Sequence, residues 1–208
     1  MVGNTGSRRS AVVLYSHDDN FFCHKVRLAL AEKSIEVTVI TVAPGVLPEG
    51  LADIPVNATL PILVDRDLVL YNSRVIIDYL DERYPHPPFM PADPISRART
   101  RLTLHRIDSE WVSLIPDAPG QTLSLAEART QLTDSLTAAT DVFSAMKFFF
   151  SDEYSILDAT LAPLLWRLPS YGILLPEQAA PIRQYAKRIF SRPGFQASLS
   201  NTERELAQ

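Results

Sequence analysis

The feature that most constrains the fold is a change of pattern about halfway along the chain. From residue 11 to about residue 83, short runs rich in β-branched residues alternate with helical segments, whereas no strand pattern follows residue 95. Alternating strands and helices predict a small mixed sheet with helices packed on it. In the second part the apolar residues recur at helical spacing, which predicts helices alone. We therefore predict an α/β domain followed by an all-α domain.

The boundaries of the individual elements follow from the same patterns. Strands are expected at residues 11–16 and 36–42, and a hairpin is expected within 60–72, turning at Asp65–Asp67. Helices are expected at 23–33, after an N-cap at Ser73, and at 96–115, 124–146 and 155–168, with further helices near the end of the chain. Ser155 and Asp158 stand at the spacing of a capping box.

Between the two halves lies "YPHPPFMPADP", residues 84–94, which we call the seam. Proline fixes φ and restricts the residue before it, so this stretch is stiff. It is either a spacer between domains or a preformed surface for recognition by another protein. We divide the chain into a flexible arm (1–10), a first domain (11–84), a proline-rich linker and surface (85–95) and a helical domain (96–208).

Charge and composition exclude several classes of function. The net charge is −4 and no run of lysine or arginine exceeds a pair, so direct binding to nucleic acid is not expected. The single cysteine excludes an intramolecular disulfide, no apolar stretch is long enough to span a membrane, and the first ten residues lack the apolar core of a signal peptide. The four histidines have no ligand spacing. We predict a cytoplasmic protein without metal or cofactor.

In an α/β domain of this order, the N-terminus of the first helix is the natural place for chemistry, because it stabilises anions and lowers thiol pKa values. Here that turn carries Asn20, and the cysteine stands three residues later, at Cys23. Asparagine cannot serve as a nucleophile with a tunable pKa. We predict that Cys23 is a small buried side chain, that His24 lies on the surface, and that Ser16 is the remaining candidate hydroxyl.

The stretch "LPILVDRDLVLYNSRVIIDYLDERYP" resembles the thioredoxin-like half of glutathione S-transferases, and "SILDATLAPLL" resembles their helical half. This resemblance implies a glutathione S-transferase-like fold in which Pro61 is a cis-proline. It places Asn72 and Ser73 at the pair that holds the γ-glutamyl group and Asn20 at the activating residue. Because Asn20 and Asn72 depart from the residues usual there, these four positions are interpreted as a vestigial glutathione site without transferase catalysis.

Four further segments resemble the stringent starvation protein A family of Gram-negative bacteria: "YLDERYPHPPFMP", "RARTRLTLHRIDSEW", "FFFSDEYSILDATLAPLLWRLPSYGI" and "FQASLSNTEREL". The resemblance implies a homodimeric regulator that contacts RNA polymerase holoenzyme and its primary sigma factor under stress and meets DNA only through the polymerase. In that family the Pro-His-Pro tripeptide is the functional surface. Here the implied surface is Tyr84, Pro85, His86 and Pro87, together with Asp93, where relatives often carry a tyrosine.

Alternatives remain open at this point. One is a glutathione-dependent transferase or thiol enzyme, which requires an accessible Cys23 or Ser16 and glutathione near Pro61 and Ser73. Another is a nucleotide-sensing heterodimer, in which an alarmone binds with a second, related chain. A basic flank on the first helix of the second half is either a solvated face or a contact for an acidic partner: Arg97, Arg99, Arg101 and Arg106.

Overall fold

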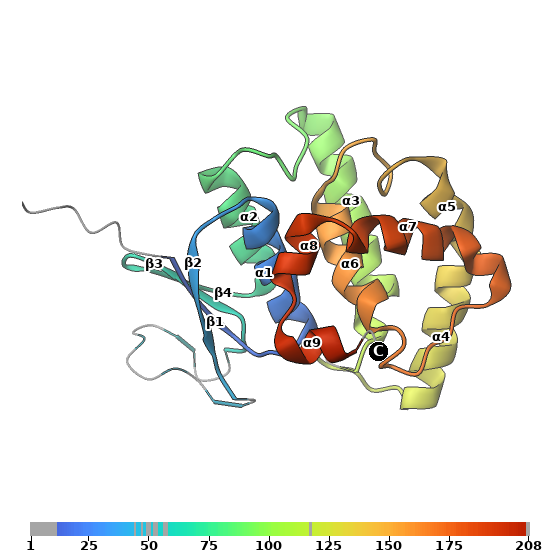
Figure 1. Cartoon of the computed structure of the whole chain (residues 1–208), viewed down its shortest axis with the longest axis horizontal. Coiled ribbons are helices and arrows are strands. Elements are labelled where there is room, and N and C mark those ends of the chain that lie inside the picture. The colour runs from blue at the N-terminus through green and yellow to red at the C-terminus, as the bar shows by residue number, and fades with distance from the viewer. Residues whose placement is uncertain are drawn as a thin grey trace, which may run out of the picture.

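The computed structural model describes residues 12–206 except 44, 47, 49–50, 52–53, 56–57 and 117, so the predicted arm at 1–10 lies outside the described residues. The first half contains β1 (Val12–Ser16), α1 (Phe21–Glu32), β2 (Val37–Thr41), β3 (Ile62–Asp65), β4 (Leu68–Tyr71) and α2 (Ser73–Arg83). The second half contains α3 (Pro94–Glu110), α4 (Leu125–Ala138), α5 (Thr140–Ala145), α6 (Ile156–Arg167), α7 (Ala180–Phe190), α8 (Pro193–Ser198) and α9 (Asn201–Glu205), with short 3-10 helices at Val112–Leu114 and Glu177–Ala179. The predicted α/β domain and helical domain are confirmed, and the two lie side by side (Figure 1).

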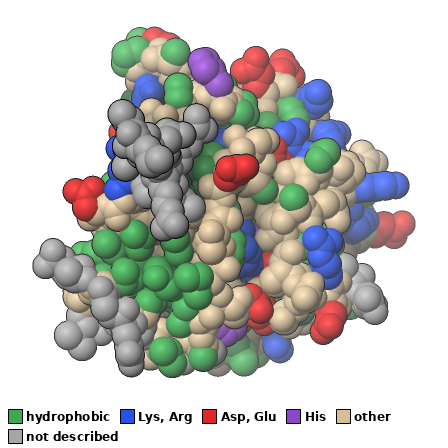
Figure 2. Space-filling view, turned by 60° about the vertical axis from the view of Figure 1, so that its left-hand side comes forward, with side chains coloured by type: hydrophobic (Ala, Val, Ile, Leu, Met, Phe, Trp, Pro, Cys, Tyr) green, Lys and Arg blue, Asp and Glu red, His purple; other side chains and the backbone are tan. Residues whose placement is uncertain are grey.

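The four strands form one mixed sheet in the order β2-β1-β3-β4. β1 runs parallel to β2 and antiparallel to β3, and β3 and β4 form the predicted hairpin, in which Asp65 pairs with Leu68. Alternate side chains of β1 are buried against the helices, whereas edge residues of β2 such as Ile40 remain 40% exposed. Figure 2, which brings the sheet side forward, shows hydrophobic side chains gathered there.

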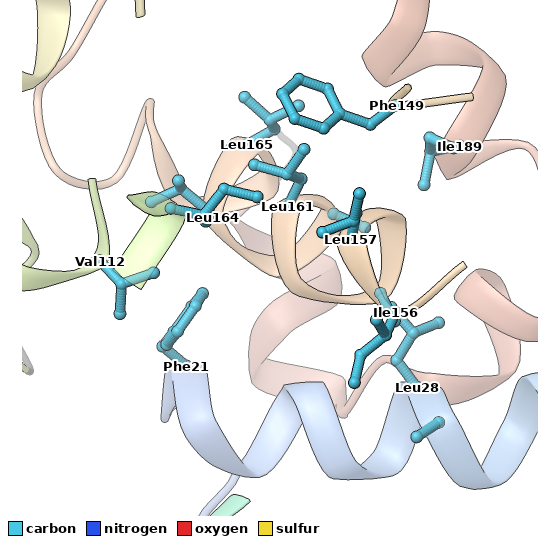
Figure 3. Close-up of a cluster of buried hydrophobic side chains, with 14 of the residues drawn as sticks. Phe21, Leu28, Val112, Phe149, Ile156, Leu157, Leu161, Leu164, Leu165 and Ile189 are labelled. Carbon is cyan, nitrogen blue, oxygen red and sulfur yellow. The ribbon is translucent and has the colours of Figure 1, made fainter. Parts of the chain in front are cut away.

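Helix α1 is the central element of the molecule, because both domains pack on it. It contacts α2 in the first domain and α6 and α8 in the helical domain. Figure 3 shows Phe21 and Leu28 of α1 pointing toward the side that carries Ile156 and Leu164 of α6. All four of these side chains are at most 1% exposed. The hydrophobic core is therefore continuous across the boundary between the two domains.

Two details of the expected elements are wrong. The N-cap of α2 is Asn72 and not Ser73, because the Asn72 Oδ1 accepts the backbone N–H of Arg74 at 2.9 Å. Asn72 has φ +76, a conformation that asparagine tolerates better than most residues.

The single helix expected at 124–146 is divided at Ala139 into α4 and α5, where the N–H of Ala139 bonds to carbonyls in the last turn of α4.

The predicted capping box at the start of α6 is confirmed and does more than cap the helix. Ser155 and Asp158 bond reciprocally, and the Asp158 Oδ1 also accepts the backbone N–H of Phe149 at 2.9 Å and the Tyr185 hydroxyl at 2.6 Å. Burial raises the pKa of the Asp158 carboxyl, and these hydrogen bonds offset that effect only in part. Asp158 therefore joins α6 to α7 and to the preceding loop.

Candidate interaction surface and interdomain cavity

The seam is a loop whose first part is exposed and whose second part is buried. The side chains of residues 85–87, the Pro-His-Pro tripeptide, are exposed, and the His86–Pro87 peptide is cis. Phe89 and Met90 are only 1% and 6% exposed. The Phe89 carbonyl accepts the N–H of Ile156 at the start of α6, at 3.1 Å. The tripeptide is thus presented by a loop that is anchored in the core between the domains.

A buried ion pair holds the seam from the inside. The Lys33 Nζ lies 2.8 Å from the Asp81 Oδ1 and donates to the carbonyls of Tyr84 and Pro87 at 2.8 and 2.7 Å. It also lies 4.5 Å from the centroid of the Phe89 ring, while the Asp81 carboxylate accepts the Phe89 N–H at 2.8 Å. The carbonyls of Tyr84 and Pro87 and the N–H of Phe89 are therefore satisfied from the inside of the protein. Sequence reasoning missed Lys33 and Asp81, which stand 48 positions apart in the chain.

Tyr84 and Asp93, at the two ends of the predicted surface, have structural partners. Tyr84 is half-buried, and its ring lies 5.5 Å from the Arg83 guanidinium carbon. The Asp93 carboxylate is the N-cap of α3 and accepts the N–H of Ser96 at 2.8 Å, and Pro94 occupies the first helical turn. These hydrogen bonds hold the pKa of Asp93 below its usual value. Its carboxylate is therefore engaged in capping α3, although the side chain is exposed near the end of the seam.

At the start of α1, the candidate reactive groups have other roles. The Asn20 Oδ1 accepts the N–H of Cys23 at 2.9 Å, which makes Asn20 the N-cap of α1. Cys23 is fully buried, as predicted; its Sγ accepts the His17 N–H at 3.3 Å, and burial raises the pKa of its thiol. Ser16 is also fully buried and accepts a hydrogen bond from Arg27. Cys23 and Ser16 are therefore not exposed nucleophiles, and Asn20 carries no nucleophilic group.

A cavity of about 370 Å³ lies between the two domains. Pro61, Asn72 and Ser73, three of the four predicted glutathione-site positions, line it together. The Leu60–Pro61 peptide is cis, as the resemblance implies. Asn20, the fourth position, is not among the lining residues. The structure thus brings three of the four predicted positions together in one cavity.

His24 is buried, so its predicted position on the surface is wrong. Its side chain is fully enclosed because α6 and α8 cover the side of α1 that was expected to face solvent. The Nδ1 of His24 lies 2.8 Å from an Arg167 nitrogen, which can only donate, so the proton of the neutral ring resides on Nε2 and is donated to Ser198 at 3.0 Å. Burial lowers the pKa of His24 well below its usual value, and the charges of Arg167 and Arg27 lower it further.

The same cluster joins the two domains through one carboxylate. Glu203 of α9 is fully buried, and its Oε1 accepts hydrogen bonds from Arg27 of α1, at 2.6 Å, and from Arg167 of α6. Arg27 also donates to the Ser198 carbonyl at 3.1 Å. The carboxylate is balanced by two cations, as a buried charge requires. This arrangement fixes α9 against the first domain, so the role of the cluster is structural.

The basic flank of α3 stays on the surface. Arg99, Arg101 and Arg106 are exposed and Arg97 is half-buried. Arg106 pairs with Glu110 one turn later at 3.0 Å. A pair of this kind in solvent contributes little to stability.

The part of the chain that the structure describes contains neither a metal site nor a membrane-spanning helix. No group of three or more His, Cys, Asp or Glu residues there is arranged to hold a metal ion. Likewise, no helix in that part is both long enough and apolar enough to cross a bilayer.

Comparison with known protein families agrees with the fold. The family model described as "Glutathione S-transferase, N-terminal domain" matches residues 14–88, and "Glutathione S-transferase, C-terminal domain" matches residues 102–193. Among solved structures, a theta class glutathione S-transferase from Xanthomonas axonopodis pv. citri has a TM-score of 0.77 at 21% identity and covers 92% of this chain and 98% of its own. A Tau class enzyme from mango has a TM-score of 0.76 at 24% identity and covers 96% of each chain.

Curated relatives are more similar in sequence. A "Stringent starvation protein A homolog" of Coxiella burnetii is 42% identical over 203 residues, covering 97% of each chain. The homolog of Pasteurella multocida is 40% identical over 198 residues, covering 94% of this chain and 93% of its own. These alignments span both domains and the seam between them.

Proposed function

The chain belongs to the stringent starvation protein A family, and we propose that it is an RNA polymerase-associated transcription regulator that works by protein contact. The proposed partners are the polymerase holoenzyme and its primary sigma factor, with DNA engaged only through the polymerase. As the family resemblance implies, we propose a homodimer in the cytoplasm. Regulation of this kind requires a recognition surface and no covalent step.

The observation that carries the proposal is the exposed Pro-His-Pro tripeptide on an anchored loop. Prolines at 85 and 87 restrict the backbone around His86, and Lys33 fixes the carbonyls on either side. Because the loop is ordered before a partner arrives, binding loses little conformational entropy. The surface offers two apolar rings and one imidazole, which suits contact with a protein rather than with phosphate.

The groups at the start of α1 support a role without transferase catalysis. Transferase chemistry requires a hydrogen-bond donor beside the thiol of bound glutathione. The cap of α1 uses only the Oδ1 of Asn20, so its amide N–H, a neutral donor, is what remains at this turn. The Cys23 thiol is fully buried with a raised pKa, which disfavours the thiolate. We therefore propose that the transferase fold serves here as a scaffold.

The experiment is binding of the purified protein to RNA polymerase holoenzyme, comparing wild type with a His86→Ala/Pro87→Ala variant. We expect the double variant to lose at least tenfold in affinity while its circular dichroism and melting temperature stay unchanged. Leu174→Ala serves as the matched control, because Leu174 is 84% exposed on the helical domain, away from the seam. This control is expected to bind like wild type.

Two results would count against the proposal. Equal binding of the double variant and wild type would remove the seam as the contact. Absence of binding by every form of the protein would remove the polymerase as partner. In that case the cavity lined by Pro61, Asn72 and Ser73 favours the second candidate, a glutathione-dependent enzyme. That candidate predicts conjugation of a model electrophile that increases with glutathione concentration.

A further inference from the structure

The helical domain contains a cavity that the proposed function does not use. Helix α7 packs against both α6 and α8 (Figure 1), and a cavity of about 610 Å³ opens beside it. Its walls come from α6, from α7, from the loop at 168–175 and from Gln196 of α8. None of the described residues that line it belongs to the seam or to the cavity between the domains. It is therefore separate from both sites described above.

The inner wall of this cavity is apolar. Leu168 and Ile173 are 3% and 4% exposed, and Leu165 of α6 and Ile182 of α7 are also buried. Sites for small molecules are concave and mostly apolar, with a few polar groups that fix the orientation of the ligand. An apolar group that enters such a space leaves water and gains contacts with these side chains. The cavity therefore suits a ligand with a substantial apolar part.

Two arginines hold the outer wall of the cavity in place. Arg183 of α7 donates to the carbonyls of Leu175 and Pro176 at 3.1 and 2.7 Å. From the other side, Arg129 of α4 donates to the Tyr171 carbonyl at 2.5 Å. These bonds fix the loop at 168–175 from within the protein itself. The cavity is therefore preformed, which reduces the conformational entropy lost on binding.

Helix α7 and its C-cap line the cavity with two parallel rows of side chains. The inner row is apolar and is buried or half-buried: Ile182, Ala186 and Phe190. The outer row is polar and exposed: Arg183, Lys187 and Ser191. Each row repeats every four residues, as neighbours on one helix face do, and spans about 12 Å. The two rows together form an elongated apolar wall with a polar edge.

The polar row carries positive charge without an acidic neighbour in the cavity. None of the described residues that line the cavity is Asp or Glu. Among the described residues Arg183 bonds to backbone carbonyls alone, and the Lys187 ammonium has no hydrogen-bond or ion-pair partner. Like charges one turn apart on a helix repel each other. An anion at this edge relieves that repulsion, so the site is complementary to a negatively charged head group.

We propose that this cavity binds a single medium-chain fatty acid, with its hydrocarbon chain along the apolar row of α7 and its carboxylate beside Lys187. A carboxylate accepts hydrogen bonds from an ammonium and from a hydroxyl, which the polar row offers at Lys187 and Ser191. An extended peptide fits less well, because its backbone N–H and C=O groups would lie unpaired against the apolar row. The proposal does not rest on polymerase binding, since it concerns a different part of the molecule.

The test is a calorimetric titration of the purified full chain with decanoate, kept below the concentration at which decanoate forms micelles. We expect saturable binding. Decanol, which has the chain without the charge, should bind more weakly, and acetate, which has the charge without the chain, should not bind. The methyl NMR signals of Ile173 and Ile182 are expected to shift as decanoate is added, because both side chains line the cavity.

Two variants test the two rows separately. Ala186→Phe fills the apolar row and is expected to weaken decanoate binding at least tenfold. Lys187→Glu reverses the charge at an exposed position and is expected to weaken decanoate binding by about fivefold while decanol binding stays unchanged. Lys147→Glu is the matched control, because Lys147 is exposed and does not line the cavity. Circular dichroism and melting temperature without ligand check that each variant is folded.

Four results would overturn the proposal. They are the absence of saturable decanoate binding, decanol binding as tight as that of decanoate, equal binding of decanoate by Ala186→Phe and wild type, and equal binding by the two glutamate variants. Should Ala186→Phe fail to fold, Lys187→Glu and the NMR shifts still decide the outcome. Shifts confined to residues outside the cavity would contradict the proposal in the same way.

Discussion

Lys25 and Lys33 stand eight residues apart, one within α1 and one at its C-cap, and both are buried, but their surroundings differ completely. Lys33 has a carboxylate at 2.8 Å and two backbone carbonyls, so its charge and its donors are satisfied. Lys25 has no such partner within the described residues and lines a cavity. The comparison teaches that burial alone does not tell whether a charged side chain is paired. The number of polar partners distinguishes the two lysines.

The largest expected effect comes from making the same substitution at both lysines. Lys33→Met leaves the partly buried Asp81 carboxylate without its cation and the seam carbonyls without a donor, so we expect the free energy of unfolding to fall by about 3 kcal/mol. Lys25→Met removes an unpaired charge and keeps the volume, so we expect it to rise by about 1 kcal/mol. Urea denaturation of the two variants and wild type measures the difference.

A loss of less than 1 kcal/mol in Lys33→Met would contradict the assignment of Lys33 as the anchor of the seam. A clear loss of stability in Lys25→Met would mean that Lys25 has a structural partner after all. Polymerase binding provides a second readout, since only Lys33→Met is expected to weaken it. The two lysines would then differ in function as well as in stability.

The next effect concerns Arg27, the third buried cation of α1. It is tested by changing its partner, Glu203. Glu203→Gln keeps the shape of the side chain but removes the charge between Arg27 and Arg167. We expect the free energy of unfolding to fall by about 3 kcal/mol, because two buried guanidinium groups lose their counter-charge. Thermal unfolding by calorimetry measures the loss. Glu205→Gln, at an exposed position of the same helix, is the control and should change little.

A smaller effect depends on pH and comes from His24, the neighbour of Lys25. Its pKa is lowered in the folded state, so below about pH 6.5 the unfolded chain binds a proton that the folded chain does not. Stability should therefore decrease as the pH falls from 6.5, by at most about 1.4 kcal/mol per pH unit from this residue. His24→Gln should remove this contribution when denaturation curves at pH 7.5, 6.5 and 5.5 are compared.

The smallest effect tests the other end of the seam. Asp93→Ala removes the N-cap of α3, and we expect a small decrease in the free energy of unfolding, measured by urea denaturation. Asp93→Asn retains a capping side chain and should be nearly neutral. If the seam is held mainly by Lys33, polymerase binding of both Asp93 variants should remain close to that of wild type. A loss in both would place Asp93 itself in the contact.

The fold could be predicted from the sequence because its signals are local. The alternation of strands and helices, the hairpin at Asp65–Asp67 and the capping box at Ser155 each depend on residues a few positions apart. The internal roles of Lys25, Lys33 and His24 could not be predicted, because polar residues on a helix usually indicate a solvated face. Their environment comes from distant segments, as with Arg27 and Glu203, which are 176 positions apart.

The bond from Glu203 to Arg27 and Arg167 has a consequence for how the protein is made. A ribosome delivers the chain from the N-terminus, so both arginines emerge long before the carboxylate that neutralises them. Until residue 203 has emerged, the surface between the two domains carries two cations without their shared anion. We therefore expect the domains to close fully only at the end of synthesis, so that a chain cut short before Glu203 remains an easy substrate for proteases.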